Sequence, residues 1–304
     1  MIVSLALQAC PPRSKHRLKR STKFIVKAII FHRYFKQMVQ YFAYGERSLL
    51  LRKQSRYLMK CMVPYLHIGL SKQAIIDLLK NHYNWLETTF SPEICHQIYT
   101  GDVKLFEFTL NEQPFYLSLS YEGKVRKEGE LALCIKNTLG EKYYTAAVTY
   151  QNKSLYIGCI QGSRHDDGFS SEFTKAFFGI RPKAFMVTVI QQLAQALSIE
   201  HIYAVKNDTH IYNAKRYHGK AARFNLNYDQ LWEELNGHIH DQWLYELPVI
   251  TVERDLSEIK RSRRKTYRQR YEWLHDFYHQ LIVQLDMMRV MPRPHQDLNH
   301  RQPS

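Results

Sequence analysis

Apolar side chains recur every three or four positions between residues 23 and 63, which is the period of an α-helix. The positions that carry the pattern are Phe24, Lys27 (by its aliphatic stem), Ala28, Phe31, Tyr34, Phe35, Met38 and Phe42. Gly45 is expected to divide this segment into two helices. Lys and Arg fill almost the whole polar face, so the segment is able to lie on anionic lipid. The alternative is a helical layer packed on the core with a solvated basic face.

Two further helices are predicted before residue 100. Ser71 is a suitable N-cap for a helix over residues 71–85, because its side-chain oxygen can accept a hydrogen bond from a free backbone N–H of the first turn. Pro92 fits the first helical position of a short helix over residues 91–98.

From residue 102 the apolar period changes to two, which is typical of half-buried strands. Segments with this pattern cover residues 104–110, 114–121, 130–135, 143–150 and 155–161. Their connections are short and polar, with a hairpin at residues 111–113. Consecutive strands with such connections favour an antiparallel meander.

The last part of the chain mixes helices with one strand. A polar, glycine-bearing loop precedes a helix over residues 182–197, and a strand over residues 199–205 follows. A short helix is predicted over residues 228–235 and a long one over residues 256–285. The apolar stripe of the long helix is expected at Tyr267, Tyr271, Leu274, Tyr278 and Ile282.

These elements predict an α+β fold with N-terminal helices, a central antiparallel sheet and a long basic C-terminal helix. We divide the chain into a basic N-terminal segment (residues 1–22), a helical region (23–100), a mixed α+β domain (101–285) and a disordered tail (286–304). Hydrophobic residues make up 45% of the 304 residues and charged residues 23%, which excludes a wholly disordered chain.

The net charge of +15 is spread unevenly along the chain. Residues 1–80 hold 16 Lys and Arg against two acids, whereas residues 81–259 hold 17 against 22. Residues 260–270 add seven Lys and Arg and no acid. The centre is therefore mildly acidic, which disfavours a main domain that wraps nucleic acid. Basic flanks that dock on an anionic partner fit this distribution better.

Targeting signals are sparse. No apolar run approaches the ~18–20 residues of a transmembrane helix. No Lys or Arg precedes the short apolar stretch of residues 1–10, so we expect an unprocessed N-terminus. The five cysteines are odd in number and include no C-x-x-C pair, which predicts a reduced, cytoplasmic protein, with peripheral attachment to the inner membrane as a further expectation.

Several common catalytic motifs are absent from the sequence. It holds no G-x-G-x-x-G, no G-x-x-x-x-G-K-[ST] and no G-x-S-x-G, which disfavours dehydrogenases, P-loop proteins and α/β-hydrolases. His275 and His279 stand one helical turn apart, but no glutamate follows the first of them, so we expect no metal site.

The order of elements around residues 155–205 carries more information. A strand ending at Gln161 and Gly162 leads through a loop into a helix whose first turn carries Arg181 and Lys183. A helix N-terminus flanked by such cations is a ready site for phosphate or carboxylate. This order resembles the coenzyme-A-binding core of the GNAT acyltransferases, and the resemblance implies acyl-CoA as the cofactor. The usual Q/R-x-x-G-x-G/A turn of that superfamily is absent, and the loop is longer. The alternative is an ordinary α+β domain in which Arg181 and Lys183 pair with local acids such as Glu172.

A second resemblance covers roughly residues 25–285. The segments that carry it are residues 157–162, 179–183, 204–207, His210, 228–234, 247–248 and 260–271. Together they resemble the VirK/YbjX family of Gram-negative bacteria. The resemblance implies a bacterial protein linked to virulence, to surface-protein expression and to resistance of the envelope against cationic antimicrobial peptides. It supplies no catalytic residues.

Two functional hypotheses follow. The first is an acyltransferase that modifies an envelope precursor, in which His210 is the candidate general base because imidazole titrates near neutral pH. Glu233 and Tyr212 are the candidates for orienting the acceptor, and Gln161, Gly162, Arg181 and Lys183 are those for holding the cofactor.

The second hypothesis is a non-enzymatic peripheral factor that supports outer-membrane protein expression. The basic clusters from Lys15 to Lys27 and from Lys260 to Arg270 would attach it to an anionic membrane surface. RNA is the less favoured partner of the same clusters, although Tyr267 is able to stack on a base.

Overall fold

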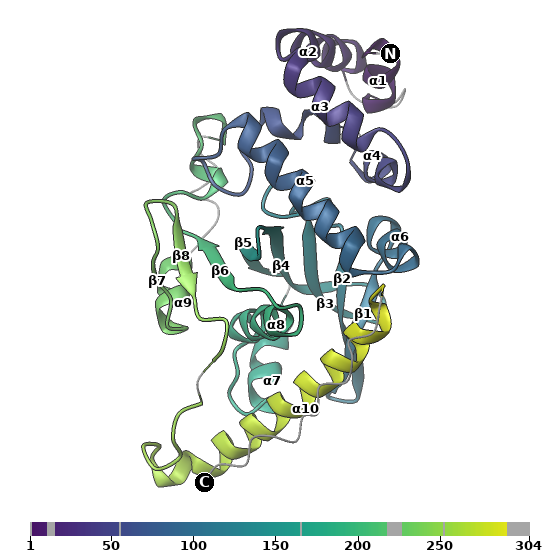
Figure 1. Ribbon diagram of the computed structural model, residues 1–304. Helices are drawn as coiled ribbons and strands as arrows, with labels where there is room; N and C mark the ends of the chain where they lie inside the picture. Colours follow the sequence, from purple (N-terminus) through teal and green to yellow (C-terminus); the bar gives the residue numbers. More distant parts are fainter. Residues whose placement is uncertain are drawn as a thin grey trace.

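The computed structural model describes residues 2–10, 16–54, 56–164, 166–217, 227–251 and 253–290. Figure 1 shows one mixed sheet with helices on both faces and a layer of N-terminal helices at one end. No helix within these described ranges is long and apolar enough to cross a membrane.

The sheet has eight strands in the order β1-β2-β3-β4-β5-β6-β8-β7. The strands are β1 (Val103–Leu110), β2 (Gln113–Ser120), β3 (Leu131–Asn137), β4 (Lys142–Gln151), β5 (Ser154–Gly162), β6 (His201–Val205), β7 (His238–Ile239) and β8 (Leu244–Leu247). The first five form the antiparallel meander that the alternating pattern predicted. β6 then pairs parallel to β5, and β8 pairs antiparallel to β6. The fold is therefore α+β with a mostly antiparallel sheet.

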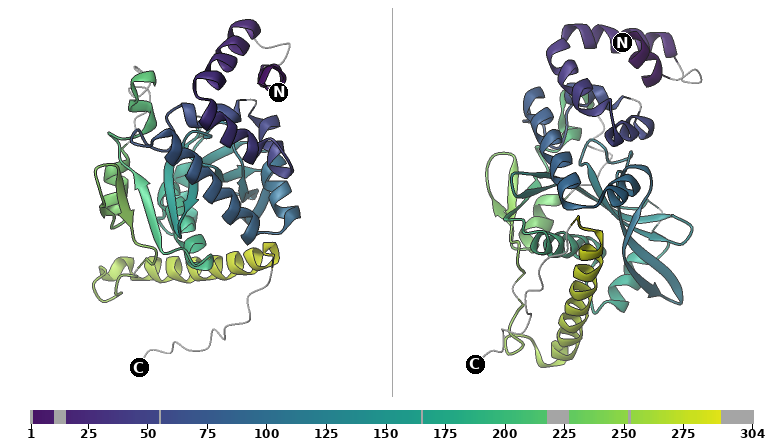
Figure 2. Two further views of the ribbon diagram at one scale, coloured as in Figure 1. Left: turned by 45° about the horizontal axis from the view of Figure 1, so that its top comes forward. Right: turned by 45° about the vertical axis from the view of Figure 1, so that its right-hand side comes forward.

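Ten α-helices and several short 3-10 turns complete the part of the chain that is described. The helices are α1 (Ile2–Ala9), α2 (Arg17–Ile30), α3 (His32–Phe42), α4 (Leu49–Lys53), α5 (Lys72–Thr89), α6 (Pro92–Thr100), α7 (Phe169–Ala176), α8 (Pro182–Ala196), α9 (Tyr228–Glu234) and α10 (Arg264–Met288). The 3-10 turns used below are η1 (Glu46–Ser48) and η2 (Tyr57–Met62). The helices α5 and α6 cover one face of the sheet, and α7, α8 and α10 cover the other (Figures 1 and 2).

The predicted Ser71 cap of α5 and the predicted place of Pro92 in α6 are confirmed, and Ser91 is the N-cap of α6. The Ser71 hydroxyl accepts from the backbone N–H of Ala74 at 3.1 Å, and the Ser91 hydroxyl from that of Ile94 at 3.4 Å, with Pro92 at the first helical position. These contacts satisfy backbone groups that have no partner within the helix.

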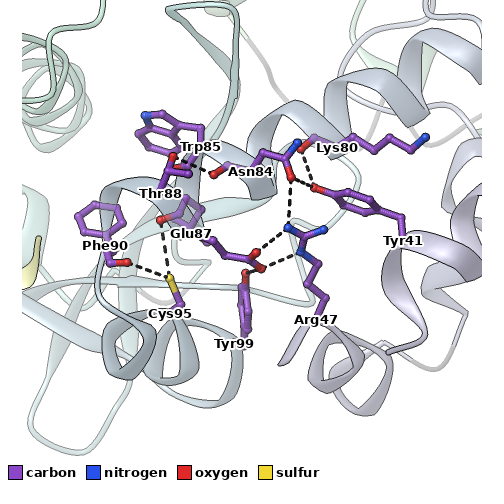
Figure 3. Close-up of polar contacts among 11 residues, drawn as sticks. Tyr41, Arg47, Lys80, Asn84, Trp85, Glu87, Thr88, Phe90, Cys95 and Tyr99 are labelled. Atoms are coloured by element: carbon purple, nitrogen blue, oxygen red, sulfur yellow. Dashed lines mark hydrogen bonds and ion pairs between the residues drawn. The ribbon is translucent and has the colours of Figure 1, made fainter. Parts of the chain in front are cut away.

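The N-terminal helices are held on α5 by a network around Glu87. Arg47 donates to both carboxylate oxygens of Glu87, at 2.7 and 2.5 Å, and the Tyr99 hydroxyl donates to the same carboxylate at 2.8 Å (Figure 3). Arg47 also reaches Asn84, which the Tyr41 hydroxyl contacts too. Burial lowers the pKa of Arg47, but the Glu87 hydrogen bond and the charges of Tyr41, Glu87 and Tyr99 together outweigh it and leave that pKa raised. The guanidinium therefore stays charged and fixes η1, α5 and α6 together.

Two details of the expected helices are wrong. The helical segment breaks at Phe31 as well as near Gly45, so α2 and α3 are separate helices. The expected loop after β5 contains α7, whose Phe169 and Phe173 are buried four positions apart. The sequence contains this helical spacing, but the polar residues around the two phenylalanines led to the prediction of a loop.

The long C-terminal helix also differs from its prediction. It begins at Arg264 rather than at residue 256, and its fully buried side chains are Phe277, Leu281, Leu285 and Met288. The residues expected in the apolar stripe are all only half-buried, because the helix buries a neighbouring face instead; they are Tyr267, Tyr271, Leu274, Tyr278 and Ile282. The basic half of α10 extends beyond the sheet (Figure 1). The guanidinium of Arg270 lies over the Tyr267 ring at 4.4 Å. α10 ends at Met288, and residues 291–304 of the expected tail lie outside the described residues.

Candidate functional site

A pocket of about 710 Å³ opens between α2, the segment around η2, and the β2–β3 loop (residues 121–130). The residues that line it are His16, Lys19, Arg20, Lys23, Phe24, Lys27, Lys53, Gln54, Arg56, Met59, Lys60, Val63, Tyr65, Gly123, Arg126, Lys127, Arg216 and Tyr217. Ten of these described lining residues are Lys or Arg, and none of them is Asp or Glu. We refer to this site as the cationic pocket.

Helix α2 supplies one wall of the cationic pocket. Lys19, Lys23 and Lys27 are spaced four residues apart, so they project from one face of the helix. Burial lowers the pKa of Lys27, and the positive charges of Arg216, Lys23, Arg56 and Lys72 lower it further. The cations therefore repel one another in this concave site, and an anion placed among them would relieve that repulsion.

The floor of the pocket contains a buried ion pair. Lys60 contacts the Glu130 carboxylate, which also accepts from the hydroxyls of Tyr57 at 2.8 Å and Tyr83 at 2.7 Å. The Lys60 ammonium lies 4.8 Å from the ring centres of both Tyr57 and Tyr65. Burial lowers the pKa of Lys60. Burial also acts to raise the pKa of Glu130, but the charge of Lys60 and the hydrogen bonds leave that pKa below its usual value. Among the described lining cations, Lys60 is the one paired with a carboxylate.

A second buried pair lies behind the pocket wall. His210 Nε2 is 3.1 Å from Glu128 Oε1, and Gln161 Nε2 donates to the same oxygen at 2.9 Å. The His210 and Glu128 side chains are 0% and 1% exposed, so neither reaches the pocket directly. The backbone N–H of Tyr212 donates to His210 Nδ1 at 3.4 Å. The imidazole is thereby held in one orientation between a carboxylate and a backbone donor.

Two aromatic side chains separate this pair from the cationic pocket. Tyr217 lines the pocket, and its ring is edge-on to that of Tyr212 with 6.1 Å between centres. The Tyr212 ring lies in turn 5.0 Å from the His210 ring. Burial raises the pKa of Tyr212, and the nearby Glu128 raises it further, so its hydroxyl stays protonated.

Glycines allow the β2–β3 loop to lie directly on the sheet. A Cβ on Gly158 would come 1.7 Å from the backbone oxygen of Glu128, and one on Gly129 would come 2.7 Å from the backbone nitrogen of Val148. These approaches place Glu128 and Glu130 inside the protein, where each meets a cation or an imidazole.

The strands β5 and β6 form a fork. They pair only from Ser154 to Ile157 on β5, and the rest of β5 continues without β6. Helix α9 fills the opening. The Tyr228 hydroxyl bonds to the backbone N–H of Ile160 at 3.1 Å and to its carbonyl at 3.4 Å, while Trp232 donates to the carbonyl of Val205 at 3.0 Å.

The structure brings some of the sequence candidates together and separates others. His210, Tyr212 and Gln161 surround Glu128, whereas Gly162 packs under the Tyr144 ring at the end of β5. Glu233 lies on α9 and accepts from the Tyr245 hydroxyl at 3.0 Å.

The candidates for binding the cofactor stand at the start of α8. Arg181 is the N-cap residue of that helix, and Lys183 is exposed in its first turn. Arg181 forms an exposed ion pair with Glu234, not with the Glu172 considered from the sequence. Nearby, Arg270 donates to the carbonyl of Phe178 at 3.0 and 2.6 Å.

The sequence reasoning missed Lys60, Glu128 and Glu130. A usable signal was present, because Glu128-Gly129-Glu130 places two acids at the start of an apolar strand. The basic side chains of α2 were recognised, but as a surface and not as the wall of a pocket. The part of the basic cluster at Lys15 lies outside the described residues.

Comparison with known protein families shows to which family the chain belongs. Residues 13–282 match the family described as "Protein of unknown function (DUF535)". This chain belongs to that family. The match spans most of the chain and includes both the cationic pocket and the His210–Glu128 pair.

Individual relatives agree with the VirK/YbjX resemblance. The chain is 28% identical to "Uncharacterized protein YbjX" of Escherichia coli over 284 residues, which is 90% of this chain and 86% of the relative. It is also 28% identical to an "Uncharacterized protein" of Haemophilus influenzae, over 62% of this chain and 63% of that protein. No solved structure was found to match the chain.

Proposed function

We propose that the protein binds an anionic ligand that carries several phosphate groups, and that the cationic pocket is its binding site. The observation that carries this proposal is the lining of the pocket, in which ten Lys and Arg gather and nine of them have no carboxylate partner among the described residues. Hydrogen bonds between such side chains and phosphate are charge-assisted and strong. A single phosphate would leave most of these cations without a counter-charge, so a ligand with two or more phosphates fits better.

The dimensions of the pocket support the same proposal. Its volume of about 710 Å³ is within the range of roughly 300–1,000 Å³ that is usual for small-molecule sites. Phe24, Met59, Val63 and Tyr65 add apolar surface beside the cations. The site thus suits a ligand with a phosphorylated part and an apolar part. A phosphorylated molecule of the bacterial envelope has this character, in line with the envelope role that the VirK/YbjX resemblance implies.

The test is calorimetric titration of the full chain with tripolyphosphate. We expect Lys23→Gln/Lys27→Gln to weaken the affinity by tenfold to hundredfold, because each lost charge-assisted contact contributes ~1.5–3 kcal/mol before the remaining cations compensate. The matched control is Arg261→Gln/Arg263→Gln, which removes the same charge from the turn before α10. Equal weakening by both variants would show a general charge effect and refute the pocket.

A second candidate function is acyl transfer of the GNAT type. The observation that favours it is the β5–β6 fork followed by a helix whose first turn carries Arg181 and Lys183. In this proposal acyl-CoA binds at the start of α8 and His210 is the base, with Glu233 and Tyr212 placed near the acceptor. A pantetheine arm between the strands would have to displace the Tyr228 hydroxyl from Ile160.

Thermal denaturation with acyl-CoA tests this second candidate. A ligand that binds only the folded state raises the melting temperature. We expect such a rise, and we expect Arg181→Ala/Lys183→Ala to abolish it while tripolyphosphate binding is kept. A rise that persists in Arg181→Ala/Lys183→Ala, or no rise at all at millimolar acyl-CoA, would eliminate acyl transfer at the start of α8. The tripolyphosphate titration tests the cationic pocket separately.

A further inference from the structure

Helices α1 and α2 form the outermost layer of the protein, at the end opposite α10 (Figures 1 and 2). Ala6 and Ala9 of α1 are buried, as are Phe24 and Ala28 of α2. The two helices are therefore packed onto the protein by one side each and leave a second side open.

That open side is aliphatic. Six large apolar side chains of α1 and α2 are between 45% and 84% exposed. They are Val3, Leu7, Leu18, Val26, Ile29 and Ile30. These two short helices thus hold six of the fourteen exposed large apolar side chains in the described residues. We call this set the aliphatic ridge.

The ridge adjoins the cationic pocket through α2 itself. With about 100° between successive residues, Leu18, Val26 and Ile29 project within about 80° of one another. Lys19, Lys23 and Lys27 of the same helix occupy the neighbouring sector, which Ile30 shares, and these lysines line the pocket. A helix that simply faced water would carry polar residues where the ridge stands. An aliphatic face beside a Lys/Arg face is instead the pattern of helices that lie in a bilayer interface.

The charge of α1 and α2 indicates what covers the aliphatic ridge. The sequences of α1 and α2 contain no Asp or Glu, and α2 carries five Lys and Arg. Two copies of the chain packed ridge to ridge would bring these cations together. An anionic bilayer instead offers acyl chains to the ridge and negative headgroups to the cations beside it.

We infer that the aliphatic ridge docks into the interface of an anionic bilayer. In that position the cationic pocket faces the headgroup layer, and the phosphates that it binds belong to a lipid. This last step rests on the proposed function of the pocket, whereas docking of the ridge does not.

Vesicle flotation of the full chain tests the inference. The vesicles contain phosphatidylcholine alone or phosphatidylcholine with 30% phosphatidylglycerol, a composition chosen to supply acyl chains and anionic phosphate together. We expect flotation with the anionic vesicles and a loss of at least tenfold in vesicle affinity for Leu18→Ser/Ile29→Ser. The matched control is Val283→Ser/Met287→Ser, which replaces two side chains of α10 that are 60% and 68% exposed. This control should float like the unchanged protein.

Tripolyphosphate binding separates the two proposals. Leu18→Ser/Ile29→Ser should keep its affinity for tripolyphosphate, which also shows that the variant is folded, whereas Lys23→Gln/Lys27→Gln should lose it. Undiminished flotation of the ridge variant would overturn docking by the ridge. A change in the oligomeric state of the ridge variant, measured by light scattering, would also overturn it. Retention of the unchanged protein by RNA but not by anionic vesicles would do the same. If tripolyphosphate fails to bind while flotation still needs the ridge, only the pocket proposal falls.

Discussion

Replacing Glu130 by glutamine removes the charge that neutralises Lys60 at the floor of the cationic pocket. The Glu130 carboxylate accepts from the Lys60 ammonium and from the hydroxyls of Tyr57 and Tyr83. Both members of the ion pair are almost completely buried, with side chains 2% and 0% exposed. In Glu130→Gln the ammonium stays in place without a counter-charge, and one of the two acceptor oxygens is replaced by an amide N–H₂ that cannot accept a hydrogen bond.

The expected cost follows from this burial. Removal of one partner from a buried, hydrogen-bonded pair destabilises a protein by ~3–5 kcal/mol, because the other charge is left without compensation. A typical folded protein is stable by only ~5–15 kcal/mol, so Glu130→Gln should lose a large part of the total. Lys60→Met/Glu130→Leu removes both charges, and its cost should be clearly smaller than the sum of the two single substitutions.

Urea denaturation followed by circular dichroism measures these differences. The pKa of Glu130 is below its unfolded value, so its contribution to stability is complete above the ordinary carboxyl pKa and is lost as the pH falls through the lowered one. The difference between the unchanged protein and Glu130→Gln should therefore shrink in acid. A loss below 1 kcal/mol at neutral pH, or strict additivity in the double variant, would refute the reasoning.

Two other predictions concern buried groups outside the pocket. Burial lowers the pKa of His82 to about 4 from an ordinary 6.5, so the free energy of unfolding should fall by ~3 kcal/mol as the pH falls from 6.5 to 4. His82→Gln should flatten this part of the curve of unfolding free energy against pH. Gly158→Ala should prevent folding or severely lower the free energy of unfolding, because its Cβ would meet a backbone oxygen at 1.7 Å, and a folded Gly158→Ala of normal stability would contradict the packing of the β2–β3 loop. The control Gly123→Ala, with open space around the new Cβ, should change the free energy of unfolding by less than ~1 kcal/mol.

Much of the fold was predictable because its signals are local. The alternating segments predicted five strands of the sheet, and Ser71 and Pro92 marked the starts of α5 and α6. The element after β5 was misjudged, since Phe169 and Phe173 stand among polar residues that suggested a loop. The short β7 and β8 were missed for a related reason, because two and four residues are too few to show a period.

The candidate site was only partly predictable. His210, Tyr212 and Gln161 were selected from the sequence, but the residue that joins them, Glu128, was not. Glu128 stands more than 30 positions from Gln161 and 80 from His210 in the chain, and no local pattern relates residues at such distances. Only the close approach at Gly158 brings its loop onto the sheet.

The sequence by itself determined the helical and strand periods, the family resemblance, and the concentration of positive charge in the first 80 residues, because each can be read from the order of residues along the chain. The tertiary structure decided where that charge is gathered in space. It folds α2 over η2 and the β2–β3 loop, so that lysines and arginines from distant segments line one pocket while the aliphatic side of α2 remains outside. A basic helix in the sequence is compatible with a solvated face, a membrane surface or a binding site. The choice depends on which of its faces the rest of the chain covers, and that is settled only by long-range packing.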